Sequence, residues 1–177
     1  MSLMESIKQK AKSGKKRILL PEGPEERTIQ AVKIIMEEGI ADVTLLGSEA
    51  EIRESAKKFG VPLEGVEIVD PSTDKDFDEY AAIYCELRKK KGMTTEKAIA
   101  TMKSPLFYAA MMIKQGRGDG MVAGAICTTG DTLRPALQII KVAPGISVVS
   151  SCFIMEVPNK AYGDDGLMLF GDCAVNP

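Results

Sequence analysis

The chain has 177 residues, 45% of them hydrophobic, so it is long enough to bury the core of one domain and part of a second. Its 23 basic and 25 acidic residues are interspersed and give a formal charge of −2; with no basic stripe and only 5% aromatic residues, no nucleic-acid partner is expected. The sequence contains no histidine, which excludes an imidazole base and a histidine-bound metal, and we predict neither a metal site nor a cofactor.

The cysteines are scattered and form no CxxC pair, and no signal peptide precedes them; they are Cys85, Cys127, Cys152 and Cys173. This pattern predicts reduced thiols in a cytoplasmic protein. No apolar stretch approaches the length needed to cross a bilayer, so no membrane association is expected.

Strand-like and helix-like segments alternate through the first 145 residues. Strands are expected at 17–23, 41–47, 66–71 and 120–126, and helices at 24–39, 49–60, 74–91, from 94, and at 104–116. Ser48 and Glu51 have the spacing of a capping box, and Ser104 precedes Pro105 as a cap precedes a first helical position. This alternation predicts right-handed βαβ crossovers and a three-layer αβα sandwich with a mostly parallel sheet.

The alternation of strands and helices stops at Ile146. Residues 146–157 and 166–175 read as strands joined by a turn-rich segment, which predicts an antiparallel hairpin. We therefore expect an α/β domain over 1–145, and a hairpin over 146–177 that leads toward a second domain absent from this chain. The apolar run at 120–126, by contrast, is typical of a central strand of a parallel sheet.

Residues 123–138, "AGAICTTGDTLRPALQ", raise the main functional question. Pro135 is tolerated only in a first helical turn, so we expect a helix to start between Gly130 and Arg134. The backbone N–H groups of about Thr128 to Thr132 would then be unpaired at the positive end of a helix, beside the carboxyl edge of a parallel strand. Such a position binds phosphate or carboxylate groups in many α/β proteins.

Two interpretations of this segment stay open on spacing alone. Thr128, Thr129 and Thr132 offer hydroxyl donors, and Arg134 offers a planar charged fork suited to an oxyanion. Threonine, glycine and aspartate are equally the residues of a helix cap, with Asp131 as the capping residue.

Other segments are weaker candidates. The glycines of "GRGDG" at 116–120 precede a strand, whereas a dinucleotide loop follows one, so a turn is favoured there. Arg88 stands near a helix end among lysines, which is typical of a solvated face. Ser150 and Ser151 lie within an expected strand and lack a histidine base, so a hydrolase nucleophile is not expected.

Four stretches together resemble the phosphate acetyltransferase and phosphate butyryltransferase family. They are "ILLPEGPEERTIQA" at 18–31, "ELRKKKGMTTEKA" at 86–98, "DGMVAGAICTTGDTLRPALQIIK" at 119–141 and "GDCAVNP" at 171–177. The third is the most specific, because the family carries a Ser/Thr-rich loop with a DT-x-R pattern there. The resemblance implies a sandwich of the isocitrate/isopropylmalate dehydrogenase type.

The resemblance also implies acyl transfer between coenzyme A and inorganic phosphate, with acetyl-CoA or CoA and phosphate or acetyl phosphate as partners. Coenzyme A is a substrate here rather than a cofactor. Two family arginines that contact CoA or phosphate match Arg88 and Arg134, and Arg134 is the expected catalytic residue. The part lining the phosphate pocket matches Thr128, Thr129, Gly130, Asp131 and Thr132.

The chain departs from the family in length. Members are about twice as long, and their catalytic Ser–Arg pair and base-forming Asp come from the later part, so we expect an incomplete enzyme with little activity alone. Ser150, Ser151 and Asp172 do not match those missing positions. An uncovered interdomain face would expose apolar surface, so a homo-oligomer is expected.

Alternatives remain at this point. One is a non-catalytic module that binds acyl-CoA or phosphate, as in the phosphotransacetylase-like domains fused to malic enzymes. Another is phosphate butyryltransferase, since the acetyl assignment is the softer part of the resemblance. The last is a generic α/β domain in which the Thr-rich loop only caps a helix.

Overall fold

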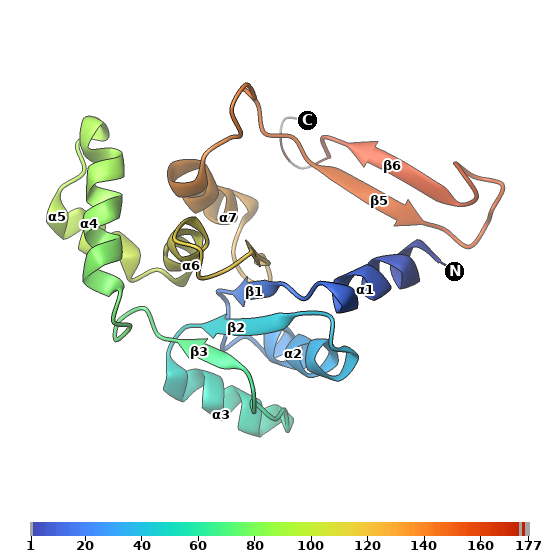
Figure 1. Ribbon diagram of the computed structural model, residues 1–177, viewed down its shortest axis with the longest axis horizontal. Coiled ribbons are helices and arrows are strands. Elements are labelled where there is room, and N and C mark those ends of the chain that lie inside the picture. The colour runs from blue at the N-terminus through green and yellow to red at the C-terminus, as the bar shows by residue number, and fades with distance from the viewer. Residues whose placement is uncertain (1, 174, 176–177) are drawn as a thin grey trace. The chain divides into compact units, whose positions relative to one another are not determined.

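A computed structural model describes residues 2–173 and residue 175 (Figure 1). The last stretch that resembles the family, 171–177, therefore lies partly outside the described residues. The chain divides into two units, residues 7–141 and a smaller one formed by the described residues up to Ser6 and from Val142 onward.

The order of elements follows the alternation expected from the sequence. The helices are α1 (Leu3–Ser13), α2 (Glu26–Glu38), α3 (Glu49–Phe59), α4 (Phe77–Arg88), α5 (Thr95–Met102), α6 (Pro105–Lys114) and α7 (Thr129–Pro135), with a 3-10 turn η1 (Lys89–Lys91) and a π-helical turn η2 (Ala136–Ile140). The strands are β1 (Arg17–Leu20), β2 (Asp42–Leu46), β3 (Glu67–Val69), β4 (Gly120–Met121), β5 (Cys152–Glu156) and β6 (Leu167–Gly171).

The larger unit is built on a parallel sheet with strand order β3-β2-β1-β4. Helix α2 connects β1 to β2, and α3 connects β2 to β3, so neighbouring parallel strands are joined by helical crossovers. The predicted α/β class with a mostly parallel sheet and a terminal antiparallel hairpin is confirmed.

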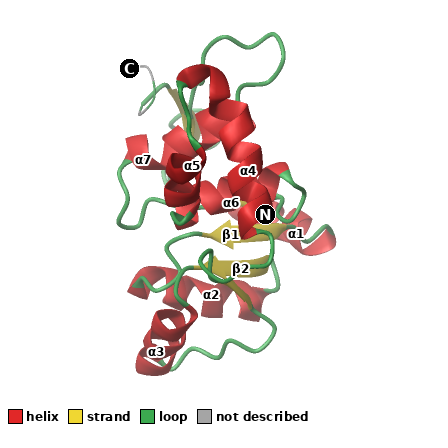
Figure 2. Cartoon of the chain, turned by 90° about the vertical axis from the view of Figure 1, so that its left-hand side faces the viewer, coloured by secondary structure: helices red, strands yellow, loops and turns green. Residues whose placement is uncertain are grey.

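Helices cover both faces of this sheet, because successive strand side chains point to opposite sides. Leu20, Val43 and Leu45 pack in one core cluster with residues of α2 and α3. Leu19 and Leu46 pack in another with residues of α4, α5 and α6. Figure 2 shows the strands between these two sets of helices, which is the predicted three-layer arrangement.

Several helix ends follow from local sequence, as predicted. The Ser48 side chain accepts a hydrogen bond from the Glu51 N–H at the start of α3, and Pro105 is the first residue of α6 after Ser104. Gly39 ends α2 in the left-handed conformation, with φ of 65°, which favours glycine.

The expectation of a central strand over 120–126 was wrong. Strand β4 covers only Gly120 and Met121, and within the described residues it lies at the edge of the sheet, paired with β1. The last ladder hydrogen bond runs from the Val122 N–H to the Leu19 carbonyl, and Gly124 then has φ of 111°. The chain leaves the sheet there, and the N–H groups of residues 124–127 bind the Glu22 side chain instead of a neighbouring strand.

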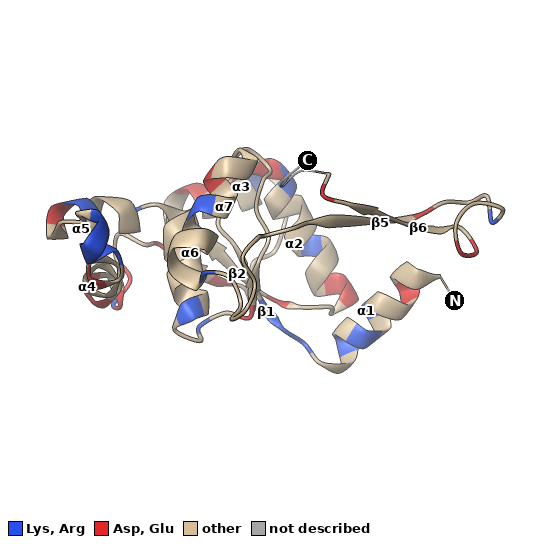
Figure 3. Cartoon of the chain, turned by 90° about the horizontal axis from the view of Figure 1, so that it is seen from above, with Lys and Arg blue, Asp and Glu red and all other residues tan. Residues whose placement is uncertain are grey.

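The smaller unit contains the antiparallel hairpin of β5 and β6, in which Ile154 pairs with Leu169. Its strands are nearly free of charged residues, as Figure 3 shows, and their large apolar side chains are exposed. Phe153 is 55% exposed and Leu169 is 70% exposed. The strands are shorter than predicted, since residues 146–151 form no strand.

Candidate functional site

Two loops lie together at the carboxyl ends of neighbouring parallel strands. The segment "PEG" at 21–23 follows β1, and residues 122–128 follow β4, which pairs with β1. Gly23 allows the first loop to turn close to β2: its N–H bonds the Leu46 carbonyl at 3.1 Å, and a Cβ on Gly23 would lie 2.6 Å from that oxygen. The turn places the Glu22 side chain beside the second loop.

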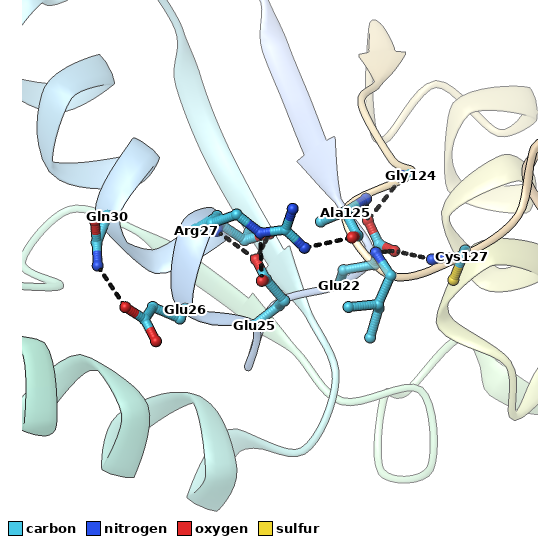
Figure 4. Close-up of polar contacts among 10 residues, drawn as sticks. Glu22, Glu25, Glu26, Arg27, Gln30, Gly124, Ala125 and Cys127 are labelled. Carbon is cyan, nitrogen blue, oxygen red and sulfur yellow. Dashed lines mark hydrogen bonds and ion pairs between the residues drawn. The ribbon is translucent and has the colours of Figure 1, made fainter.

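Glu22 accepts hydrogen bonds from four consecutive backbone N–H groups (Figure 4). One carboxylate oxygen accepts from Gly124 and Ala125 and the other from Ile126 and Cys127, each at 2.8 Å. Glu22 is only 7% exposed. Such a run of N–H groups is a concave anion-binding site, and here the anion is a side chain of the same chain.

The hydrogen bonds keep this carboxylate charged although it is buried. Burial raises the pKa of Glu22, but the N–H donors of Ile126, Ala125 and Cys127 outweigh burial and lower that pKa from 4.5 to about 2. The neighbouring Cys127 thiol responds in the opposite direction. Burial and the Glu22 carboxylate raise the pKa of Cys127 to about 11, so this thiol stays protonated at neutral pH.

A second group holds the same loop from the start of α2. Glu25 caps that helix by accepting from the Thr28 N–H at 3.0 Å, and it pairs with the Nε of Arg27 at 2.8 Å. Arg27 in turn donates from Nη2 to the Ala125 carbonyl, as Figure 4 shows. The loop is thus fixed through its N–H groups by Glu22 and through a carbonyl by Arg27.

The Thr-rich segment begins directly after this loop. Thr128 is the N-cap of α7: its hydroxyl accepts from the Asp131 N–H at 3.2 Å and donates to the Asp131 carboxylate at 2.7 Å. Asp131 is therefore not the capping residue, which corrects one of the two interpretations. Thr129 and Gly130 are exposed at the first two positions of the helix.

The predicted start of this helix was also wrong. Helix α7 begins at Thr129, so Pro135 is its seventh residue rather than part of its first turn. A proline there has no N–H to donate to the carbonyl four residues earlier. The π-helical turn η2 follows it, and there the Lys141 N–H bonds the Ala136 carbonyl at 2.9 Å.

The predicted arginines lie on neighbouring elements. Arg134 of α7 has a side chain 60% exposed and an ion pair of 3.8 Å with Asp131. Arg88 ends α4, and α4 contacts η2 through a hydrogen bond of 2.6 Å from the Tyr84 hydroxyl to Gln138. In the described part of the chain, no hydrogen bond joins Arg88 to residues 128–132.

Two of the predicted site residues carry buried polar atoms that lack a partner. The Nε of Arg88 and the Oγ1 of Thr132 are buried and make no hydrogen bond within residues 2–173. Buried polar atoms are normally hydrogen-bonded, so these two are available to a bound polar group.

A largely apolar pocket of about 470 Å³ lies beside Glu22. Ile126 and Cys127 form one part of its lining, and Ser104 and Leu106 at the start of α6 form another. Sequence reasoning did not identify Glu22 or Arg27 as functional. The available signal was an acidic residue in the loop that directly follows the first parallel strand.

The described residues contain no helix long and apolar enough to cross a membrane. They also contain no group of three or more Cys, Asp or Glu side chains placed to hold a metal ion.

Comparison with known proteins gives matches over the whole chain. A family model described as "Phosphate acetyl/butaryl transferase" matches residues 2–177. Among curated proteins, phosphate acetyltransferase of Thermoanaerobacterium thermosaccharolyticum is 54% identical over 177 residues, 100% of this chain and 53% of that protein. Phosphate acetyltransferase of Clostridium acetobutylicum is 50% identical, again over 100% of this chain and 53% of the relative.

Solved structures agree with the sequence matches. A phosphotransacetylase from Streptococcus pyogenes superposes with a TM-score of 0.88 at 35% identity, covering 98% of this chain and 52% of the other. The EutD phosphotransacetylase from Staphylococcus aureus gives 0.85 at 33% identity, covering 99% and 51%. The chain thus spans about half the length of the relatives that it matches.

Proposed function

The chain belongs to the phosphate acetyl/butaryl transferase family, and we propose that it supplies part of an enzyme that transfers an acyl group between coenzyme A and inorganic phosphate. The observation that carries the proposal is identity of about half the residues to phosphate acetyltransferases over the entire chain. The names of these relatives favour acetyl over butyryl as the acyl group.

In the proposed reaction, the CoA sulfur forms a bond to the carbonyl carbon of acetyl phosphate and the carbon–oxygen bond to phosphate breaks. The thiol proton leaves to a base, and negative charge develops on the carbonyl oxygen and on the departing phosphate. Fixed N–H donors and arginines stabilise such charge without a metal ion.

We assign the phosphate to the segment from Thr128 to Arg134. The N–H groups of Thr129 and Gly130 stand in the first turn of α7, where a helix leaves N–H groups unpaired. Arg134 is one turn further on and exposed, and among the described residues its one ion pair is the long contact with Asp131. A phosphate with more charge than one carboxylate would compete with Asp131 for that guanidinium.

Arg88 is assigned a role at the same site, toward CoA or phosphate. Its unpartnered Nε is the reason, together with the contact that brings the end of α4 against the helix that follows Arg134. The cytoplasm is the proposed location, because all four cysteines are free thiols. Self-association is proposed from the exposed apolar side chains of the hairpin.

Replacing Arg134 with alanine tests the site. We expect phosphate affinity, measured by calorimetry, to fall roughly tenfold to a hundredfold, because a charged hydrogen bond is lost. Arg53→Ala is the matched control, since Arg53 is exposed and pairs with Glu49 on the same helix. Arg53→Ala should leave phosphate affinity unchanged.

Two results would contradict the proposal. If the unmodified chain bound neither phosphate nor CoA at millimolar concentration, the proposed function would be wrong. If Arg134→Ala bound phosphate as tightly as the unmodified chain, the segment from Thr128 to Arg134 would serve only as a helix cap. A spectroscopic assay with acetyl phosphate and CoA adds a separate measurement. Because the chain spans half the length of its relatives, we expect little thioester formation, and efficient turnover would show that its own residues suffice.

A further inference from the structure

The loop formed by residues 124–127, here called the cradle loop, has no strand to pair with among the described residues. The ladder of β4 ends with the hydrogen bond from the Val122 N–H to the Leu19 carbonyl, and the four N–H groups of residues 124–127 turn inward to Glu22. Arg27 donates a hydrogen bond to the Ala125 carbonyl of the same loop. The conformation of the cradle loop therefore depends on side chains from the segment after β1.

The cradle loop leads directly into the proposed phosphate site. Cys127, its last residue, is followed at once by Thr128, the N-cap of α7. The direction in which α7 starts is therefore set by the loop that Glu22 holds. The function proposed above does not include Glu22, which faces backbone groups rather than the exposed side of Thr128 to Arg134.

We propose that Glu22 is a positioning residue of the acyl-transfer site, a built-in anion that fills the cradle loop so that substrate phosphate is received only by the segment from Thr128 to Arg134. This inference rests on the proposed function. It names a residue and a role that the sequence pattern did not indicate.

The cradle loop and the segment from Thr128 to Arg134 are adjacent anion sites that would compete for phosphate. Four convergent N–H groups would themselves attract an oxyanion if nothing filled them. A phosphate bound there would be displaced along the chain from Arg134. With a buried carboxylate already bound by four hydrogen bonds of 2.8 Å, the cradle loop accepts no second anion.

Two substitutions of Glu22 and one control test this role. Glu22→Gln keeps the size of the side chain but turns an NH₂ group toward two of the N–H donors, which it cannot satisfy. Glu22→Ala leaves all four donors without a partner. Glu26→Gln is the control, because Glu26 lies in the same segment but accepts a hydrogen bond from Gln30 of its own helix instead of from the loop, as Figure 4 shows.

The first measurement is amide hydrogen exchange at residues 124–127, followed by NMR. We expect exchange at these positions to become at least about tenfold faster in Glu22→Gln and to stay unchanged in Glu26→Gln, since a charged hydrogen bond is weakened in the first alone. Exchange at Leu45, in the middle of the sheet, reports whether each variant is folded. Unchanged exchange at 124–127 in a folded Glu22→Gln protein would overturn the proposal.

The second measurement is rescue by formate, a carboxylate small enough to replace the missing group. In Glu22→Ala, added formate should restore the protection of the four amides and should also restore phosphate affinity measured by calorimetry. Before rescue, phosphate can also enter the empty cradle loop. We therefore expect the part of the affinity that Arg134→Ala removes to be about tenfold weaker than in the unmodified chain. If formate restored the protection of the four amides but not the phosphate affinity, the role of Glu22 would be merely structural and the proposal would be overturned.

These measurements separate the failure of the inference from the failure of the proposed function. If the unmodified chain binds no phosphate, the proposed function fails and Glu22 has no substrate site to position, whatever the amides show. If the chain binds phosphate and Glu22→Gln binds it equally well, only the positioning role is wrong.

Discussion

At the scale of single residues, Glu22 shows how a buried charge becomes favourable. A carboxylate removed from water is costly unless its lone pairs are satisfied, and each Glu22 oxygen accepts two N–H groups at 2.8 Å. Asparagine or glutamine could not replace it, since their NH₂ groups are donors facing donors. The interaction therefore requires an anion and should respond to pH.

Acid titration of unfolding tests this requirement. The pKa of Glu22 is about 2 in the folded chain and near 4.5 when unfolded, so its contribution to stability is fully present above pH 4.5 and is lost as the pH falls through 2. We expect urea unfolding at pH 7 to show a difference of about 3 kcal/mol between the unmodified chain and Glu22→Gln. This difference should shrink steadily below pH 4.5; a gap that stays constant down to pH 2.5 would contradict the assignment.

At the scale of elements, Arg117 links the start of α4 to the turn before β4. Its guanidinium bonds Asp74 at 2.9 Å and Asp76 at 2.7 Å, and the Tyr108 hydroxyl of α6 donates to Asp74 at 2.7 Å. Burial raises the pKa of Asp74, but Arg117 and its other donors outweigh burial and lower it. Arg117 of the segment "GRGDG" thus belongs to a structural ion-pair network, and this role agrees with the turn that the sequence favours there.

Substitution of Arg117 should destabilise the larger unit. Arg117→Met leaves the carboxylates of Asp74 and Asp76 poorly solvated without their cation, so we expect a loss of about 3 kcal/mol in the free energy of unfolding by urea. Arg53→Met, which removes an exposed ion pair on α3, should change stability by less than about 1 kcal/mol. Equal losses of unfolding free energy in the two variants would show that the Arg117 network stabilises the chain no more than an exposed ion pair does.

At the scale of the whole molecule, the sequence predicted those features that depend on interactions between residues close together in the chain. Helix ends at Ser48 and Gly39, the alternation of elements and the terminal hairpin follow from patterns within about ten residues, and the structure confirms them. The start of α7 was predicted from Pro135, but the helix begins earlier, where Thr128 caps it. The loss of strand character after Met121 depends on Glu22, 102 positions away from Gly124, which no local pattern reveals.

The two units should also differ in resistance to protease. The larger unit holds both core clusters, whereas residues 142–148 are all exposed and form no helix or strand. We expect brief trypsin digestion to cut after the exposed Lys141 and leave a fragment ending there that melts cooperatively by circular dichroism. Mass spectrometry identifies the cut. Earlier cleavage within α2 to α6, or a fragment without a melting transition, would contradict this division.

The distance in sequence between Glu22 and its donors has a consequence for synthesis. On the ribosome, β1 to β3 with α2 and α3 can form one core cluster from residues 18 to 68 before the cradle loop exists. Through that interval Glu22 is an ordinary solvated carboxylate, and Leu19 and Leu46 lack the helix α6 that later covers them. The nascent chain therefore presents an apolar face that a chaperone would recognise. The helices that cover this face are complete once Lys114 has emerged, whereas the Glu22 carboxylate meets its four partners only after residue 127.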